Sequence, residues 1–185
     1  MGFFHQLSQQ VLDWSKVTVT LADERWVNAD HNDSNEKLVK ENLLINEAHC
    51  AKFLSLKNSA ETAVSGEAEL EAELSKYGQF TVVILGMGDD GHTASLFPGA
   101  VGLQAALEPG GISAVAALQP PAAPHTRLTL TAARLINTRH LFLQATSAEK
   151  LEVLSAAAAS EDVLSMPISW FLNQQLVPLQ VFWAP

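Results

Sequence analysis

The stretch TVVILGMGDDGHTASLFPG, residues 81–99, places a glycine-rich turn directly after a short apolar run. Residues 81–85 are β-branched except for the final leucine, a composition typical of a buried strand. A loop that follows such a strand lies at its carboxyl end, where open α/β sheets bind their ligands. The stretch therefore predicts a ligand site near His92, which directly follows the last glycine of the turn.

The first six residues of the turn, Gly86–Gly91, fit the G-x-G-x-x-G pattern of dinucleotide-binding loops. That function needs a long helix after the third glycine, but the Pro-Gly pair at the end of the stretch interrupts any helix starting near His92 within about two turns. Asp89 and Asp90 would also bring two carboxylates beside a pyrophosphate. The sequence therefore disfavours a dinucleotide cofactor.

Short apolar runs alternate with helical patterns along the rest of the chain, which indicates an α/β sheet with helices on its faces. One compact domain over residues 1–185 is expected at this length. Asp33 followed by Glu36 resembles a capping box that would start a helix running to about Cys50. The other predicted helices cover residues 3–14, 67–77 and 148–158, and the other predicted strands cover residues 17–21, 113–117, 140–144 and 179–182.

Composition and charge exclude several classes of partner. The net charge of −9 would repel a phosphate backbone, so we expect no nucleic acid partner. No apolar run is long enough to cross a bilayer, and the first residues do not form a secretory signal, so we expect a cytoplasmic protein without membrane contact. Cys50 is the only cysteine, which excludes an internal disulfide. An anionic small molecule remains possible if some of the eleven Lys and Arg residues cluster.

His92 and Asp90 form a candidate acid–base pair. An imidazole titrates near neutral pH and can accept a proton from water, while a carboxylate two residues earlier can orient the ring. The alternative is that the aspartates cap a following helix and His92 has no chemical role. The backbone N–H groups of Gly86–Gly91, including that of Gly88, can also form an anion-binding nest.

Three cations are candidates for holding an anion. Arg25 follows another predicted strand, and its alternative role is an ion pair with a neighbouring acid. Arg127 lies just after the proline-rich connection at residues 119–124, next to His125. Lys150 falls in the first turn of a predicted helix, where a cation opposes the macrodipole unless an anion is shared with the helix N–H groups, and a surface lysine is the alternative.

A catalytic metal is not expected from the spacing of possible ligands. His92 with Asp90 supplies at most two ligands, and the histidines His5, His31, His49 and His140 show no two-ligand spacing such as i, i+4 on one helix. A serine-hydrolase elbow is also absent, because Ser95 does not lie in G-x-S-x-G.

Four motifs in order along the chain resemble the 6-phosphogluconolactonase family. They are LADERWV at residues 21–27, DSN at 33–35, the glycine–histidine stretch at 86–99 and PHTRLTLT at 124–131. The resemblance implies a Rossmann-like three-layer α/β sandwich with a mainly parallel sheet flanked by helices. It also implies hydrolysis of 6-phospho-D-glucono-1,5-lactone in the pentose phosphate pathway without a metal or organic cofactor.

The same resemblance implies roles for individual residues. His92 would be the general base beside Asp90, Asp23 and Arg25 would line the substrate pocket, and Arg127 and Lys150 would help to hold the 6-phosphate. Family members begin with a strand, a helix and a second strand ending in a phosphate-binding loop. The expectation is therefore an N-terminally short domain, either a monomer or a weak homodimer through an exposed sheet edge.

Two other functions fit parts of the pattern. Glucosamine-6-phosphate isomerase/deaminase has a similar fold and glycine–histidine loop, although the Leu-Phe-Pro-Gly ending and the Asp-Glu-Arg-Trp segment favour the lactonase. A non-catalytic sugar-phosphate binding protein is the alternative of a different class.

Overall fold

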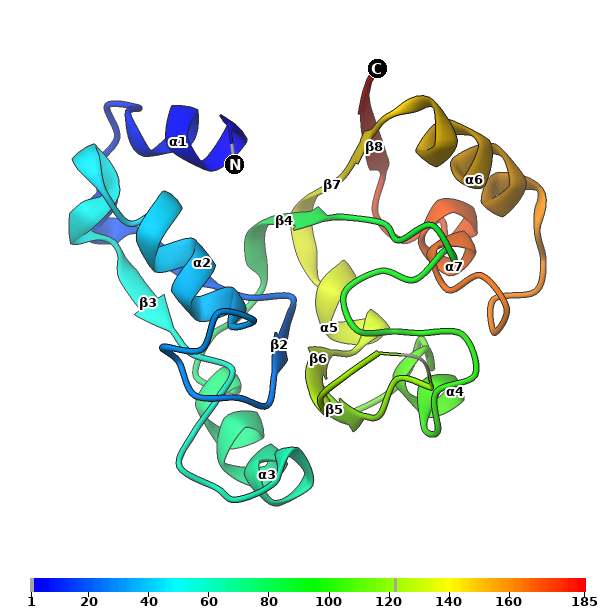
Figure 1. Ribbon diagram of the computed structural model, residues 1–185, viewed down its shortest axis with the longest axis horizontal. Coiled ribbons are helices and arrows are strands. Elements are labelled where there is room, and N and C mark those ends of the chain that lie inside the picture. The colour runs from blue at the N-terminus through cyan, green and yellow to red at the C-terminus, as the bar shows by residue number, and fades with distance from the viewer. Residues whose placement is uncertain (1, 122) are drawn as a thin grey trace.

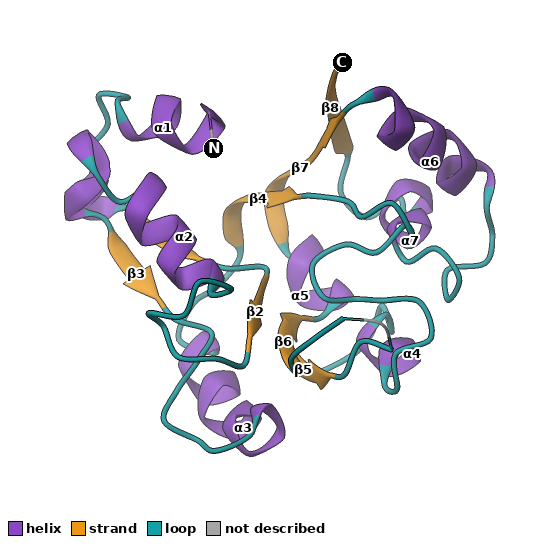
Figure 2. Cartoon of the chain, viewed as in Figure 1, coloured by secondary structure: helices purple, strands orange, loops and turns teal. Residues whose placement is uncertain are grey.

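The computed structural model describes residues 2–121 and 123–185, and its strands form three small sheets (Figures 1 and 2). Helices lie on both sides of these sheets, so the predicted α/β class is confirmed. In the first sheet, β1 Thr18–Thr20 pairs parallel with β3 Lys52–Leu54. In the second, β6 Arg127–Leu130 lies between β2 Asp23–Arg25 and β5 Val115–Leu118 and pairs antiparallel with both. In the third, β7 Thr138–Thr146 lies between β4 Phe80–Leu85 and β8 Leu179–Ala184 and pairs parallel with both.

The helices divide between the two sides of the central strands. In Figure 1, α1 and α2 lie on the side of β2 and β3, and α6 and α7 lie on the side of β7 and β8, while α3 packs against β5 and β6. The α-helices are α1 Gly2–Ser8, α2 Asn35–Asn42, α3 Ala63–Leu74, α4 Leu103–Ala106, α5 Ala132–Ile136, α6 Ala148–Ala159 and α7 Ile168–Asn173; the 3-10 helices are η1 Trp14–Lys16 and η2 Asn46–Cys50.

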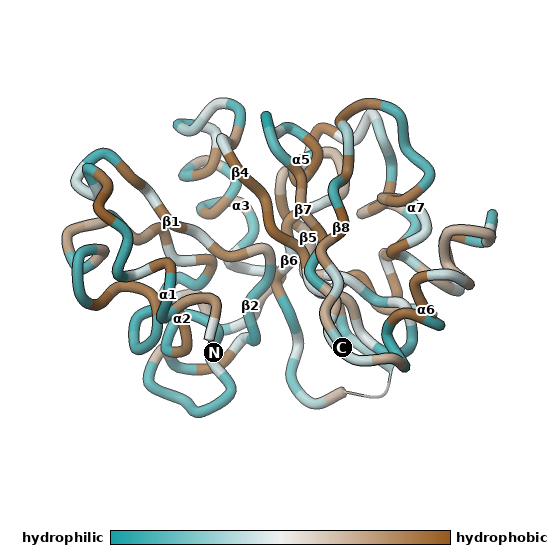
Figure 3. Tube along the Cα trace, turned by 90° about the horizontal axis from the view of Figure 1, so that it is seen from above, coloured by the Kyte–Doolittle hydropathy of each residue, from teal (hydrophilic) through white to brown (hydrophobic). Residues whose placement is uncertain are grey.

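Apolar residues are concentrated along β4 and the strands beside it (Figure 3). Leu85 of β4, Leu143 of β7 and Leu128 of β6 are all at most 1% exposed and belong to one cluster of buried residues. Burying these side chains holds the ends of β4 and β6 in place, and the loops that carry the site extend from those ends. None of the described helices is long and apolar enough to cross a membrane.

The five predicted strands are present with shifted ends, but several helix boundaries were wrong. The helix predicted from Asp33 to about Cys50 ends at Asn42, where the Leu43 and Leu44 N–H groups both donate to the Val39 carbonyl. The chain continues as η2, which begins at Asn46 in a left-handed conformation with φ 49°. The N-cap of α2 is Ser34, whose hydroxyl accepts from the Lys37 N–H.

Two other helices also differ from their predicted limits. The helix predicted at residues 67–77 covers Ala63–Leu74, because Thr62 and Ser65 form a capping box upstream. The helix predicted at residues 3–14 ends at Ser8, and Trp14 begins η1.

The sequence did not predict β2 and β6, which bring the site together. They pair antiparallel with Asp23 opposite Thr129 and Arg25 opposite Arg127. Residues opposite one another in an antiparallel pair project to the same face. The two arginine motifs are therefore neighbours in the fold, although they are far apart in the sequence.

Candidate active site

The glycine-rich turn after β4 is an irregular loop. Among the described residues no helix intervenes between β4 and α4, so Asp89 and Asp90 do not cap a following helix, and the capping part of the alternative was wrong. The Gly88 N–H donates to the carbonyl of His92 at 2.9 Å, and the Gly91 N–H donates to the carbonyl of Gly88 at 3.2 Å. Because these two donors are used inside the loop, the predicted anion nest has fewer free N–H groups than expected.

Asp90 and His92 contact one another directly. Asp90 Oδ1 lies 2.5 Å from His92 Nδ1 and also accepts the His92 backbone N–H at 3.1 Å. Partial burial acts to raise the pKa of Asp90, but the hydrogen bonds from the His92 N–H and ring, together with the His92 charge, outweigh it and hold this pKa below its ordinary value. An ionised carboxylate only accepts hydrogen bonds, so in the neutral form of the ring Nδ1 carries the proton and Nε2 presents its lone pair.

Phe97 supports the histidine ring, a contact that sequence reasoning missed. The two rings stack with centroids 4.0 Å apart and an interplanar angle of 25°. The Arg127 guanidinium lies over the same phenyl ring, 5.6 Å from its centroid. Phe97 therefore touches both the candidate base and a candidate anion-binding residue.

Asp23 is fixed by two polar neighbours. The buried Ser95 hydroxyl donates to Asp23 Oδ2 at 2.6 Å, and the Asn35 amide donates to the Asp23 carbonyl at 2.9 Å. Ser95 belongs to the glycine–histidine loop and Asn35 begins α2, so Asp23 joins three segments of the site. Asn35 was part of a motif in the sequence, but nothing there assigned it to the site.

Glu24 holds the strand that carries Arg25. Its carboxylate is 1% exposed and accepts the backbone N–H groups of Arg25, Asn35 and Glu36 at 2.7–2.8 Å and the Ser34 hydroxyl at 3.0 Å. The N-terminus of α2 therefore rests on β2. Among the described residues the Arg25 side chain pairs with no acid; its Nη1 donates to the carbonyl of Asp33 at 2.7 Å. The ion-pair alternative was wrong.

Arg25 and Arg127 form a like-charged pair across two strands. Within the described part of the chain only three buried side-chain polar atoms lack a hydrogen-bond partner, and two of them are the Nε atoms of these arginines. Arg127 is 7% exposed, and burial followed by the Arg25 charge lowers the pKa of Arg127. Two adjacent guanidinium groups with unused donors are suited to hold an anion.

A pocket of about 500 Å³ brings most of the predicted site residues together. Asp23, Arg25, Gly86, His92 and Arg127 line it, together with Asn35 and Phe97. This volume lies in the range that small-molecule sites occupy.

Three predicted site residues do not line that pocket: Asp90, Gly88 and Lys150. Asp90 contacts it only through His92. Gly88 packs against the His92–Asp90 pair. Lys150 donates to the Met87 carbonyl at 2.5 Å and to Asp89 at 2.9 Å, and it lines an adjoining pocket of about 320 Å³ that also contains Gly86.

Comparisons with known proteins give one family. A family model described as glucosamine-6-phosphate isomerases/6-phosphogluconolactonase matches residues 2–183. A 6-phosphogluconolactonase of Rhizobium meliloti (strain 1021) is 44% identical over 100% of this chain and 80% of its own length. One of Pseudomonas putida is 40% identical over 99% of this chain and 74% of its own length.

Solved structures agree with the sequence relatives. A crystal structure of a 6-phosphogluconolactonase from Shewanella baltica OS155 superposes with a TM-score of 0.96 at 44% identity, covering 100% of this chain and 78% of that one. The 6-phosphogluconolactonase from Trypanosoma brucei gives a TM-score of 0.76 at 25% identity, covering 98% of this chain and 78% of that one.

Proposed function

The chain belongs to the glucosamine-6-phosphate isomerase/6-phosphogluconolactonase family, and from that membership we propose that it is a carboxylic ester hydrolase acting on 6-phospho-D-glucono-1,5-lactone. The product is 6-phospho-D-gluconate, and the step belongs to the pentose phosphate pathway. The observation that carries the proposal is one pocket lined by both an anion-binding arginine pair and an oriented histidine. A phosphorylated substrate needs the first, and hydrolysis of its ester needs the second.

The arginine pair positions the substrate. Arg25 and Arg127 offer charged donors to the 6-phosphate, which neutralises their mutual repulsion. Binding through the phosphate brings the lactone ring toward the glycine–histidine loop and replaces a bimolecular encounter with a held geometry. Lys150 remains a proposed contributor from the adjoining pocket.

His92 acts as the general base in this proposal. Asp90 accepts the Nδ1–H and leaves Nε2 free to take a proton from water as its oxygen attacks the lactone carbonyl carbon. Attack forms a tetrahedral intermediate. Its collapse breaks the bond between that carbon and the ring oxygen, and the imidazolium returns its proton to the departing oxygen. Asp90 stabilises the imidazolium while it exists, and Phe97 holds the ring plane.

The direct test is the rate of 6-phosphogluconolactone hydrolysis by this chain, measured against spontaneous hydrolysis in the same buffer. We expect the protein to exceed the background and His92→Ala to lose about 10²–10⁴-fold in kcat, the usual contribution of a general base. His49→Ala is the matched control, because His49 is exposed on η2, outside the pocket.

A binding measurement separates the lactonase from a sugar-phosphate binding protein. In a lactonase, His92→Ala removes rate and leaves the affinity for 6-phosphogluconate nearly unchanged. A wild-type protein that binds 6-phosphogluconate but hydrolyses the lactone no faster than buffer would contradict the proposal.

A further inference from the structure

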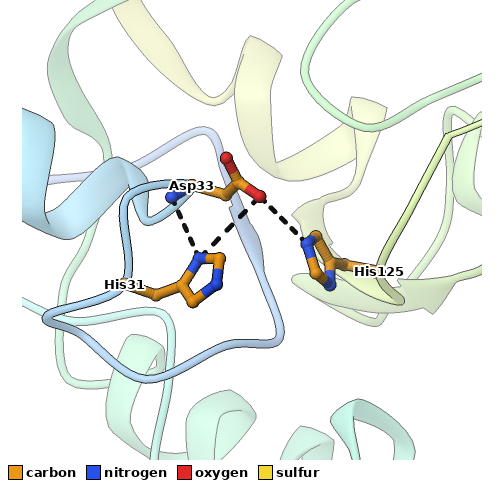
Figure 4. Close-up of side chains that lie close together, drawn as sticks. All are labelled: His31, Asp33 and His125. Atoms are coloured by element: carbon orange, nitrogen blue, oxygen red, sulfur yellow. Dashed lines mark hydrogen bonds and ion pairs between the residues drawn. The ribbon is translucent and has the colours of Figure 1, made fainter.

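We propose that His31, Asp33 and His125 form a binding site for a divalent transition-metal ion of the zinc class at the rim of the pocket. The three side chains come from two distant segments: His31 and Asp33 precede α2, and His125 precedes β6 (Figure 4). One ligand atom from each lies within 4.8 Å of the others.

The geometry is close to that of a metal site. Asp33 Oδ2 lies 3.0 Å from His125 Nε2 and 3.8 Å from His31 Nδ1, and Figure 4 shows the carboxylate between the two rings. A tetrahedral zinc ion with bonds of about 2.0–2.1 Å holds its ligand atoms roughly 3.3 Å apart. His31 and Asp33 are exposed and His125 is partly exposed, so small side-chain rotations reach this spacing.

One ring nitrogen of the cluster already carries a lone pair. His31 Nδ1 accepts the backbone N–H of Asp33 at 3.1 Å, so this nitrogen carries a lone pair on the inner side of the cluster. An ion would exchange that hydrogen bond, and the His125–Asp33 bond, for coordination. The freed Asp33 N–H turns to water because Asp33 is exposed.

The ligand set selects the kind of ion. Two imidazoles and one carboxylate match catalytic-type zinc sites, which use three protein ligands and an open fourth position. Mg²⁺ and Ca²⁺ prefer oxygen ligands and would gain only one here. The neighbouring cation, Arg25, donates to the Asp33 backbone carbonyl, so the Asp33 carboxylate stays available for the ion and offsets the Arg25 charge.

An ion at this site would join the segment before α2 to the segment before β6. Arg127 lies two residues after His125, and Arg25 is bound to Asp33, so both pocket arginines lie beside the joined segments. The site differs from the Asp90–His92 pair, because no ligand is shared. The inference does not depend on the proposed lactonase activity, since its test measures metal binding.

The test is calorimetric titration of chelator-treated protein with ZnCl₂, with MgCl₂ titrated in parallel. We expect one zinc ion per chain and no heat of binding from magnesium. His31→Gln and His125→Asn should each weaken zinc binding by more than about tenfold, because losing a direct ligand costs at least as much as losing a supporting group. Asparagine replaces His125 because residue 125 has φ 69°, a conformation that asparagine tolerates.

A second probe and two controls make the result specific. Co²⁺ should give a visible d–d absorption that weakens in the two histidine variants. His49→Gln and Cys50→Ser should bind zinc as the wild type does, although Cys50 is an exposed thiol. The proposal is overturned if the His31→Gln/His125→Asn double variant binds zinc as tightly as the wild type. It is equally overturned if Cys50→Ser or His92→Gln, rather than the double variant, removes binding.

Discussion

Gly88 lies so close to His92 that a Cβ atom added to it would come 2.1 Å from the ring Nδ1. The same atom would come 2.7 Å from Asp90 Oδ1. The backbone at Gly88 does not have positive φ, so conformational freedom is not the reason for glycine here. The Asp90–His92 contact occupies the space that any larger side chain would need.

Gly88→Ala should therefore fold normally and lose activity. The clashing atoms are the ends of two side chains that can rotate away, which separates Nδ1 from the carboxylate without disturbing the core. We expect kcat for lactone hydrolysis to fall toward the value for His92→Ala, which is itself about 10²–10⁴-fold below the wild type. Gly110→Ala is the control, because a Cβ there meets nothing within 4 Å. Unchanged kcat in Gly88→Ala would show that the Asp90–His92 contact is not needed.

The Asp90 carboxyl should titrate below its ordinary value, and His92 should be part of the reason. Burial opposes the shift, while the His92 hydrogen bonds and charge produce it. In His92→Ala the ring is lost and burial remains, so the midpoint should rise. Carboxyl carbon NMR over a pH titration measures both midpoints.

The sign of the stability effect follows from the direction of this shift. A carboxyl with a depressed folded-state pKa stabilises the fold above its unfolded pKa of about 3.9, and that contribution is lost as pH falls through the folded value. The free energy of unfolding should therefore fall less steeply with decreasing pH in Asp90→Asn than in the wild type. A midpoint for Asp90 that does not change in His92→Ala would contradict the assignment.

The strands that are long and apolar could be predicted from the sequence, while the short polar ones could not. Residues 81–85 show their strand character directly. The Asp-Glu-Arg of β2 has no strand preference, and it is extended because it pairs with β6 and because the Glu24 carboxylate is held by α2. Local pattern cannot reveal a conformation that tertiary pairing imposes.

The candidate site divides in the same way. His92 and Asp90 are two residues apart, so their contact could be predicted from the sequence. The register that sets Arg25 opposite Arg127 and the approach of His125 to Asp33 depend on segments that only the fold brings together. Phe97 and Asn35 were missed because their roles lie in supporting other side chains.

Arg127→Met should raise KM without destabilising the protein. The substitution removes a largely buried cation that lies opposite Arg25, so the free protein loses repulsion and the substrate loses a charged donor. Hydrogen bonds to charged groups contribute about 1.5–3 kcal/mol, so KM should rise about 10- to 100-fold with a smaller change in kcat. Steady-state kinetics and thermal melting measure the two effects.

Arg134→Met is the control for an arginine with a purely structural role. Arg134 donates to the carbonyls of Tyr77 and Gly78 and lies over the Phe80 ring, away from the pocket. Its loss should lower the melting temperature and leave KM unchanged. If Arg127→Met lowers stability as Arg134→Met does and leaves KM unchanged, Arg127 has a structural role.

Glu24→Gln should destabilise the fold more than its small change in size suggests. The Glu24 carboxylate accepts the Arg25 N–H on β2 and, at the N-terminus of α2, two backbone N–H groups and a hydroxyl. An amide replaces one accepting oxygen with a donor that faces these donors. It also removes the negative charge that the helix N-terminus favours. We expect the free energy of unfolding to fall by about 2–4 kcal/mol, measured by urea denaturation.

Glu41→Gln is the control, because Glu41 lies at an exposed position of α2, and it should change the free energy of unfolding by no more than about 0.5 kcal/mol. Because Glu24 also fixes the backbone of Arg25 and Asn35, the surviving folded fraction should show a higher KM. Equal losses in the two variants would mean that buried Glu24 does not hold β2 against α2.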